Sequence, residues 1–229
     1  MPSSQTIVVG DIHGCFEELQ QLLDIVNFSH NDELISIGDL VDRGPHSKEV
    51  VAFFMQTPNA FAIMGNHEDK QIRIFDGELE PSLSQTICLE QWGDYTAKAI
   101  SYFRTLPLYL YKKDFLLVHA GVLPYLPPSQ QPKNTLLRAR MPWMKGSFDK
   151  RFGGWWKYYN AKTPVVYGHS VFNEVHIENN TYGIDTGACH GQKLSAIILE
   201  SREIIQVQAS RDHWKDIREL YLTKITPPK

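Results

Sequence analysis

The chain has 229 residues, of which 42% are hydrophobic and 21% charged, with a formal net charge of −3 at pH 7. This length and hydrophobic content suffice for one sizeable core, so we expect a single domain over residues 1–229. A slightly acidic chain without a lysine- and arginine-rich run argues against nucleic acid as a partner.

The cysteines and the amino-terminal residues bear on the cellular compartment. Cys15, Cys88 and Cys189 are odd in number and widely spaced, which favours reduced thiols over a disulfide framework. Residues 1–5 lack the basic flank of a signal peptide, and no apolar run approaches the ~20 residues of a membrane span. We therefore expect a cytoplasmic protein that does not bind membranes, while its oligomeric state stays open.

The first part of the chain repeats one order of elements: a short apolar strand, a loop with polar residues, and a helix. Apolar runs predict the strands, and apolar residues at helical spacing predict the helices. The predicted elements are strands at 6–9, 34–37 and 61–64, and helices at 16–26, about 47–55 and from about 68.

The later part predicts strands at 115–118, 165–167 and 203–208, with less regular segments between them. Helical spacing within 78–104 predicts a helical insertion over the site. Residues 125–162 predict a long loop that selects the substrate, because loops after catalytic strands often do so. Aromatic side chains in this loop predict either a packed cluster, which we favour, or a stack for a nucleobase. They are Trp143, Trp155, Trp156, Tyr158 and Tyr159.

Candidate ligands follow the carboxyl ends of five predicted strands. They lie in GDIHG at 10–14, GDLVDRG at 38–44 and GNHE at 65–68, and at His119 and His169. Ligands of α/β sheets bind at the carboxyl ends of strands. Each string alone has the composition of an ordinary turn. Five such strings, each at the carboxyl end of a predicted strand, are not expected from unrelated turns. Carboxylates and imidazoles without thiolates favour a Mn, Fe or Zn centre, so we expect a two-metal site that hydrolyses a phosphate ester.

These strings resemble those of the phosphoprotein phosphatase branch of the calcineurin-like metallophosphoesterases, over roughly residues 7–199. Within that branch the chain is most similar to bacterial-type Ser/Thr protein phosphatases and symmetrical diadenosine tetraphosphatases, which share an ending like YGIDTGACHGQKLSAIIL at 182–199. The resemblance implies an α/β fold, a four-layer α/β/β/α sandwich of two mixed sheets. It places the first strands in one sheet, those from about Leu108 onward in the other, and the metals at one edge of the pair.

The resemblance also implies which residues hold the metals. The cofactor it implies is two divalent ions, with Mn first and Fe or Zn as alternatives. The expected reaction is direct attack by a hydroxide that bridges both ions, without a covalent intermediate. The implied ligands are Asp11 and His13 for the first ion, Asp39 between the two, and Asn66, His119 and His169 for the second.

Three further roles follow from the resemblance. His67 is the implied general acid, oriented by Asp42. Arg43 is expected to bind phosphate oxygens with its planar guanidinium group, a geometry that lysine lacks. A second phosphate-binding arginine is expected in TLLRARM, where we slightly prefer Arg140 over Arg138.

Three functions stay open at this point. Asp42 and Glu68 follow the protein phosphatase versions of their motifs and put a Ser/Thr protein phosphatase, acting on phosphorylated proteins, first. The DRGP string, the ARM segment and the aromatic loop favour the alternative, a bis(5'-nucleosyl)-tetraphosphatase acting on dinucleoside polyphosphates. A non-catalytic binding protein on the same fold ranks third, because the expected ligands, the acid and Arg43 are all present.

The remaining histidines lie outside the ligand motifs. His46 and His190 lie in loops near the site, in DRGPHS and ACHGQ, and are candidates for substrate contact. For His30, His176 and His213 we predict surface positions.

Overall fold

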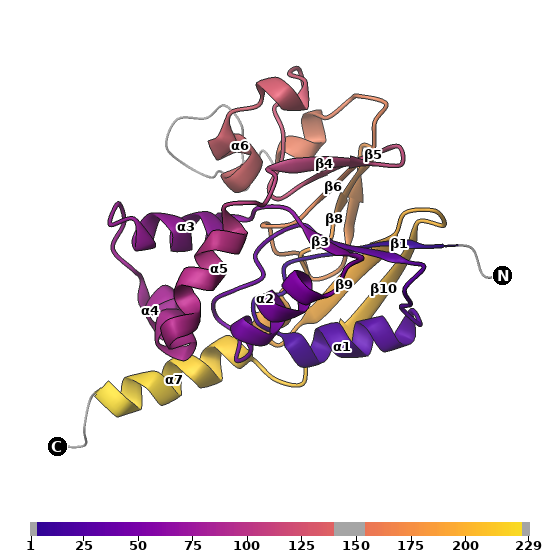
Figure 1. Cartoon of the computed structure of the whole chain (residues 1–229). Helices are drawn as coiled ribbons and strands as arrows, with labels where there is room; N and C mark the ends of the chain where they lie inside the picture. The colour runs from indigo at the N-terminus through magenta and orange to yellow at the C-terminus, as the bar shows by residue number, and fades with distance from the viewer. Residues whose placement is uncertain (1–3, 140–153, 226–229) are drawn as a thin grey trace.

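The computed structural model describes residues 4–139 and 154–225, which form two five-stranded sheets with helices around them (Figure 1). The strands are β1 (Thr6–Val9), β2 (Glu33–Ser36), β3 (Ala60–Ala62), β4 (Tyr109–Lys112), β5 (Phe115–Val118), β6 (Val165–Tyr167), β7 (His176–Glu178), β8 (Thr181–Gly183), β9 (Lys193–Ile198) and β10 (Glu203–Gln208). The α-helices are α1 (Phe16–Ile25), α2 (Ser47–Gln56), α3 (Asn66–Phe75), α4 (Leu83–Trp92), α5 (Thr96–Phe103), α6 (Lys133–Arg138) and α7 (His213–Ile225). Short 3₁₀ turns are η1 (Gly93–Tyr95), η2 (Pro128–Gln130), η3 (Trp155–Tyr158) and η4 (Ala188–His190).

Both sheets are mixed and contain three adjacent parallel strands. The first has the order β10-β9-β1-β2-β3, in which β1, β2 and β3 run parallel, β9 is antiparallel to β1, and β10 is antiparallel to β9. The second has the order β4-β5-β6-β8-β7, in which β5, β6 and β8 run parallel. The carboxyl ends of three strands in each sheet therefore share one direction, which is what a strand-end site requires.

The predicted fold class is confirmed, but one part of the predicted strand assignment is wrong. We expected all strands from about Leu108 onward in the second sheet, whereas β9 and β10 return to the first. The reason is that β9 pairs with β1, from Ile7 opposite Ile198 to Val9 opposite Ala196. Pairing between residues so far apart in sequence leaves no local pattern that could reveal it.

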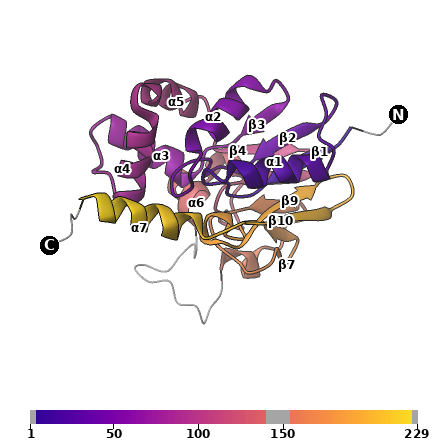
Figure 2. The same cartoon turned by 90° about the horizontal axis from the view of Figure 1, so that it is seen from below.

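The two sheets pack face to face around a core of alternating side chains. Val8 of β1 points toward the second sheet and packs with Val166 of β6 in one apolar cluster. Its neighbours Ile7 and Val9 belong to the cluster under the helices. Because both faces of β1 are covered, its sequence is an uninterrupted apolar run rather than an alternating one. Figures 1 and 2 show α1 and α2 beside the first sheet, where α1 contacts β9 and β10.

The predicted insertion at 78–104 is helical, since it contains α4, η1 and α5. Trp92 and Phe103 anchor it in the core of the first sheet, and α5 packs on α3. The carboxyl-terminal α7 contacts α4 and η4. Within the described residues, no helix combines the length and the apolar character that crossing a membrane would require.

The aromatic residues of the predicted 125–162 loop pack together where the structure describes them. Trp155, Trp156 and Tyr159 are buried in one cluster against the second sheet. The packing interpretation is therefore confirmed for these three side chains, which are not available to stack on a base. Tyr158 is exposed, and Trp143 lies outside the described residues.

Candidate metal centre and active site

Six parallel strands end at one edge of the two sheets, and each is followed within a few residues by a polar side chain. A pocket of about 270 Å³ lies there. Five of the six predicted ligands line it, and the sixth, His119, is fully buried. The residues are Asp11 and His13 after β1, Asp39 after β2, Asn66 after β3, His119 after β5, His169 after β6 and Asp185 after β8.

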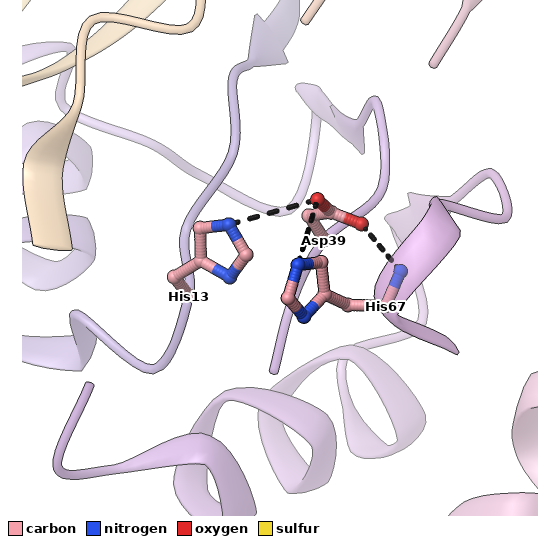
Figure 3. A group of neighbouring side chains, drawn as sticks. All are labelled: His13, Asp39 and His67. Atoms are coloured by element: carbon pink, nitrogen blue, oxygen red, sulfur yellow. Dashed lines mark hydrogen bonds and ion pairs between the residues drawn. The ribbon is translucent and has the colours of Figure 1, made fainter. Parts of the chain in front are cut away.

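Asp39 is the centre of this site. Its Oδ2 lies 3.6 Å from His13 Nε2 and 4.0 Å from His67 Nε2, and its Oδ1 lies 3.5 Å from His119 Nε2. Figure 3 shows the rings of His13 and His67 turned toward this carboxylate. At this site, ligand atoms within 4.8 Å of one another form two groups, one of Asp39 with His13 and His67 and one of Asp39 with His119 and His169. Asp39 is shared by both, which is the arrangement that a carboxylate between two cations needs.

Backbone carbonyl groups fix the orientation of two histidine rings. Nδ1 of His13 lies 2.7 Å from the carbonyl oxygen of Val41, and Nδ1 of His119 lies 2.9 Å from that of Ile37. An N–H at Nδ1 that donates to these oxygens leaves a lone pair on Nε2, which faces Asp39. Hydrogen bonding of the far nitrogen to a carbonyl is the usual way in which proteins orient a metal-binding histidine.

The second group has an electrostatic feature that suits a cation. Nε2 of His119 lies 3.0 Å from Asn66 Oδ1 while Nδ1 of the same ring faces the carbonyl oxygen of Ile37. A neutral imidazole has one N–H, so one of its nitrogens must direct a lone pair at an oxygen. That repulsion is relieved if a cation lies between Nε2 and Oδ1, or if the Asn66 amide turns over.

Burial and charge favour the protonation state that binds cations. Burial lowers the pKa of His13 and of His119, which keeps both rings neutral. Burial acts to raise the pKa of Asp39, but the surrounding imidazoles outweigh it and the pKa of this carboxyl falls. A charged carboxylate among neutral imidazoles is the state required of metal ligands.

Several site residues have a strained backbone. Among the described residues ten non-glycine residues have positive φ, and five of them belong to the site motifs. Such conformations cost of order 1–3 kcal/mol each, less for Asp, and they cluster at functional sites. The five are His13 (47°), Asp39 (53°), Asp42 (69°), Arg43 (68°) and His169 (63°).

His67 and Asp42 form a buried pair. His67 Nδ1 lies 2.5 Å from Asp42 Oδ2, and Asp42 is fully buried. Gln71 donates to Asp42 Oδ1 at 2.6 Å, and Gln85 donates to Oδ2 at 2.5 Å. Burial acts to raise the pKa of Asp42, but the hydrogen bond from His67 and those from the two amides lower it. The carboxylate is therefore charged and fully hydrogen-bonded, and Nε2 of His67 is directed into the site.

Sequence reasoning missed both glutamines. Gln71 had a signal, because it lies four residues after His67 on α3 and so shares its helix face. Gln85 had none, since only the packing of α4 brings it to Asp42.

Glu68 supports the loops of the first sheet. Its carboxylate accepts hydrogen bonds from the backbone N–H groups of Gly65, Asp39 and Leu40, at 2.8–2.9 Å. Glu68 is the third residue of α3 and Gly65 its N-cap, so one of these bonds is that of a capping box. Burial and the nearby Asp39 raise the pKa of Glu68 to about 8, while the three N–H donors oppose that shift. The residue joins the loops after β2 and β3.

Arg43 lies between two histidines. Its NH1 is 3.0 Å from His13 Nε2 and its NH2 is 3.2 Å from His67 Nε2. Each Nε2 has a single lone pair, so binding of a cation at His13 requires Arg43 to leave that nitrogen. Turning outward would point the guanidinium group at the pocket that it already lines.

The second phosphate-binding arginine is not decided by the structure. Arg140, which we preferred, lies outside the described residues. Arg138 lies 2.5 Å from Asp69 Oδ2, and Lys133 lies 2.6 Å from Asp69 Oδ1. Arg138 therefore ties α6 to α3.

Asp185 is a site residue to which we assigned no role. It lines the pocket and lies near Asp11, whose oxygens accept a hydrogen bond from the backbone N–H of His169 at 3.2 Å each. Burial raises the pKa of Asp185 to about 6, and burial together with Asp185 raises that of Asp11. Two buried carboxylates are costly side by side unless a proton or a cation is shared. The signal was available, since Asp185 follows an apolar run as the other ligands do.

Asp11 differs from the other carboxylate and histidine ligands that we predicted. Among the described residues it joins neither of the two groups of close ligand atoms, although it lines the same pocket.

The other histidines divide differently from our expectation. His190 lines the pocket, whereas His46 lies on the surface near Glu17 and Glu49. The surface prediction is wrong for His213, which is buried because its Nε2 lies 2.8 Å from the carboxylate of Glu18. His30 is exposed as predicted, and His176 is partly buried.

The chain belongs to the calcineurin-like phosphoesterase family, whose sequence model matches residues 5–204. The carboxylates, histidines and asparagine that follow six parallel strands in this structure agree with that membership. The chain is accordingly a metallophosphoesterase, of a family that works with a binuclear divalent metal centre.

Among curated proteins the chain is similar to two kinds of tetraphosphatase. It is 31% identical to the asymmetrical bis(5'-nucleosyl)-tetraphosphatase PrpE of Oceanobacillus iheyensis, over 89% of this chain and 92% of that one. It is 28% identical to a symmetrical bis(5'-nucleosyl)-tetraphosphatase of Coxiella burnetii, over 88% of this chain and 91% of that one.

Solved structures agree on the fold. A crystal structure of a candidate diadenosine tetraphosphatase superposes with a TM-score of 0.76 and 26% identity, covering 91% of this chain and 95% of the other. A Ser/Thr protein phosphatase from Saccharomyces cerevisiae, with similarity to human PP5, superposes with a TM-score of 0.64. The latter is 19% identical, covers 92% of this chain, and shows the fold alone.

Proposed function

We propose that the protein is a dinucleoside polyphosphate hydrolase, a bis(5'-nucleosyl)-tetraphosphatase. The observation that carries the proposal is the near full-length similarity to tetraphosphatases that cleave symmetrically and asymmetrically. The pocket adds support, because Lys70 lines it together with Arg43. Two cationic side chains suit a chain of several phosphates better than a single phosphate group. The order of our two sequence-based predictions is thereby reversed.

We propose two divalent ions, with Mn first and Fe or Zn as alternatives. The donor set fits such ions, since neutral imidazoles and carboxylates converge on Asp39 and the lone pairs at His119 and Asn66 face each other. Bound there, divalent ions polarise the phosphoryl group and lower the pKa of coordinated water. The proposed ligands are Asp11, His13, Asp39, Asn66, His119 and His169, with Asp185 beside Asp11.

The side chains around the ions have separate proposed tasks. Arg43 donates N–H groups to the phosphate oxygens and so orients the scissile group. Once Arg43 has left Nε2 of His67 for the phosphate, that nitrogen can carry a proton and give it to the oxygen that leaves, while Nδ1–H stays bonded to Asp42. Lys70 neutralises charge on the part of the phosphate chain that does not react. Because a nucleotide phosphate is a better leaving group than a serine alkoxide, hydrolysis of a dinucleotide depends less on His67.

A Ser/Thr protein phosphatase remains the second candidate. Its support is the Asp42 partner of His67, which is suited to protonating a poor leaving group such as the alkoxide of serine.

A competition assay tests the proposal. Purified protein with Mn²⁺ should hydrolyse diadenosine tetraphosphate with a kcat/KM at least tenfold above that for a phosphoserine peptide. Chromatography of the products then distinguishes two ADP from ATP and AMP. An Asp39→Asn variant, prepared in parallel, controls for contaminating hydrolases. A higher kcat/KM on the phosphopeptide would overturn the proposal in favour of the second candidate, and an absence of metal-dependent activity on either would overturn both.

A further inference from the structure

A second cluster of metal-ligating side chains lies behind the site. Cys15 directly follows the GDIHG loop, Glu18 is in the first turn of α1, and His213 begins α7. One potential ligand atom from each of the three lies within 4.8 Å of the other two. All three side chains are buried, and none belongs to the proposed phosphoesterase machinery.

One atom of this cluster lacks a partner. Glu18 is 2% exposed, and its Oε1 faces His213 Nε2 at 2.8 Å and the backbone N–H of Ser210 at 3.3 Å. Its Oε2 is buried and has no hydrogen-bond partner within the described part of the chain. A buried carboxylate oxygen without a partner is rare and costly, and it calls for a ligand.

The sulfur is poorly satisfied as well. Among the described residues the Cys15 thiol has one hydrogen bond, a long one of 3.8 Å to the carbonyl oxygen of His13. A cation would be a stronger partner for this sulfur than a distant carbonyl oxygen, because zinc binds cysteine sulfur directly.

We propose that Cys15, Glu18 and His213 form a zinc site separate from the phosphoesterase centre. Thiolate, carboxylate and imidazole are the three donor types that zinc takes in proteins, and the thiolate excludes Mg²⁺ and Ca²⁺ as natural occupants. Binding displaces the thiol proton of Cys15 to solvent. The proton shared by His213 Nε2 and Glu18 also leaves or moves to Nδ1 of the ring, so that bonds to the ion replace this hydrogen bond. His213 also lines a surface pocket of about 270 Å³.

The position of the cluster indicates what zinc would do there. It would join α7 to α1 and to the residue after the GDIHG loop, segments that lie almost 200 residues apart in sequence. The hydrogen bond between Glu18 and His213, with a sequence separation of 195 residues, already makes that connection. Zinc would therefore fix the carboxyl-terminal helix to the catalytic domain.

Cobalt substitution separates this site from the phosphoesterase centre, whose proposed ligands include no sulfur. Metal-free full-length protein is titrated with Co²⁺ and its near-ultraviolet spectrum is recorded. We expect a thiolate-to-cobalt charge-transfer band whose full intensity corresponds to one thiolate-bound ion per chain. The band should be lost in Cys15→Ser and kept in Cys88→Ser, which removes another buried thiol.

Metal counting is the second measurement. The wild-type protein should hold three Zn²⁺ per chain after dialysis, whereas Cys15→Ser and His213→Gln should hold two. Retention of two ions shows that a variant is folded. Zn²⁺ should also raise the Tm of the wild type more than that of either variant. The proposal is overturned if the wild type shows no charge-transfer band, if the band persists in Cys15→Ser, or if it disappears only in Cys189→Ser. None of these outcomes bears on the proposed hydrolase activity.

Discussion

The two halves of the phosphoesterase site are built differently. The half from the first sheet, after β1, β2 and β3, supports itself: Glu68 joins its loops, and Gln71 and Gln85 hold Asp42 under His67. The half from the second sheet, after β5, β6 and β8, has backbone hydrogen bonds of its own, from Gly168 N–H to the carbonyl oxygen of His119 and from Phe172 N–H to that of Asp185, but two of its ligands are also held by the first half. The ring of His119 is oriented by a carbonyl group of the first sheet, and the backbone of His169 donates to Asp11.

This difference indicates that the second half depends on the first more than the first depends on the second. The first half provides a template, and two ligands of the second half, His119 and His169, are oriented by contacts with it. Damage to the support of the first half should then be felt at both metal ions, whereas damage to the second half should stay local. The dependence also agrees with the strained backbone, because four of the five positive-φ site residues belong to the first half.

The largest expected effect is at the proposed acid of the first half. His67→Asn should lower kcat by about 10²–10⁴-fold on an alkyl phosphate, the range typical of general acid catalysis. With p-nitrophenyl phosphate the loss should be much smaller, because that leaving group needs no proton. Steady-state kinetics on both substrates measures the contrast. An equal loss on the two substrates would show that His67 does not act as an acid.

The next effect tests the template itself. Glu68→Gln keeps the shape of the side chain but replaces one carboxylate oxygen with an NH₂ group, which cannot accept a backbone N–H. It should therefore weaken metal binding by about 10–100-fold, the usual effect of changing a residue that supports metal ligands. Calorimetric titration of metal-free protein should show the loss for both ions. Glu49→Gln, on the exposed face of α2, is the matched control and should bind metals normally. A loss confined to one ion would mean that the halves are independent.

The same contrast explains what the sequence could predict. Strands 6–9, 115–118 and 165–167 have the predicted bounds because local apolar runs determine them. Ligands at strand ends were visible for the same reason. Contacts between elements far apart in sequence could not be predicted. Gln85 reaches Asp42 only through the packing of α4, and β9 pairs with β1 although most of the chain separates them. His213 looked like a surface residue because its partner is 195 residues away.

A smaller effect concerns the substrate rather than the metals. Lys70 lines the pocket from α3, on the rim of the first half. Lys70→Ala should raise KM for diadenosine tetraphosphate by about two- to fivefold, the range of a partly exposed charge interaction, and leave KM for p-nitrophenyl phosphate unchanged. Lys215→Ala removes an equivalent charge away from the pocket and serves as the control. Equal increases for both substrates would place Lys70 at the reacting phosphate instead.

The smallest expected effect is on stability, at an ion-pair cluster that connects the two halves outside the pocket. Asp69 on α3 binds Lys133 and Arg138 of α6, which follows the second-half loop after β5. Burial acts to raise the pKa of Asp69, but these two cations lower it below 3.8. A depressed pKa in the folded state contributes stability that is present above the unfolded value and is lost as pH falls through the folded one.

Asp69→Asn should therefore lower the free energy of unfolding by about 1 kcal/mol at pH 7, a modest value because Lys133 is largely exposed. The gap between the wild type and the variant should close as the pH falls below 3.8, the ordinary pKa of an aspartate. Urea unfolding of metal-free protein between pH 7 and pH 3 measures it, with Asp24→Asn on the exposed face of α1 as the control. A gap that stayed constant with pH would mean that Asp69 acts through its shape and hydrogen bonds, since a charge effect must vanish when the carboxyl is protonated in both states.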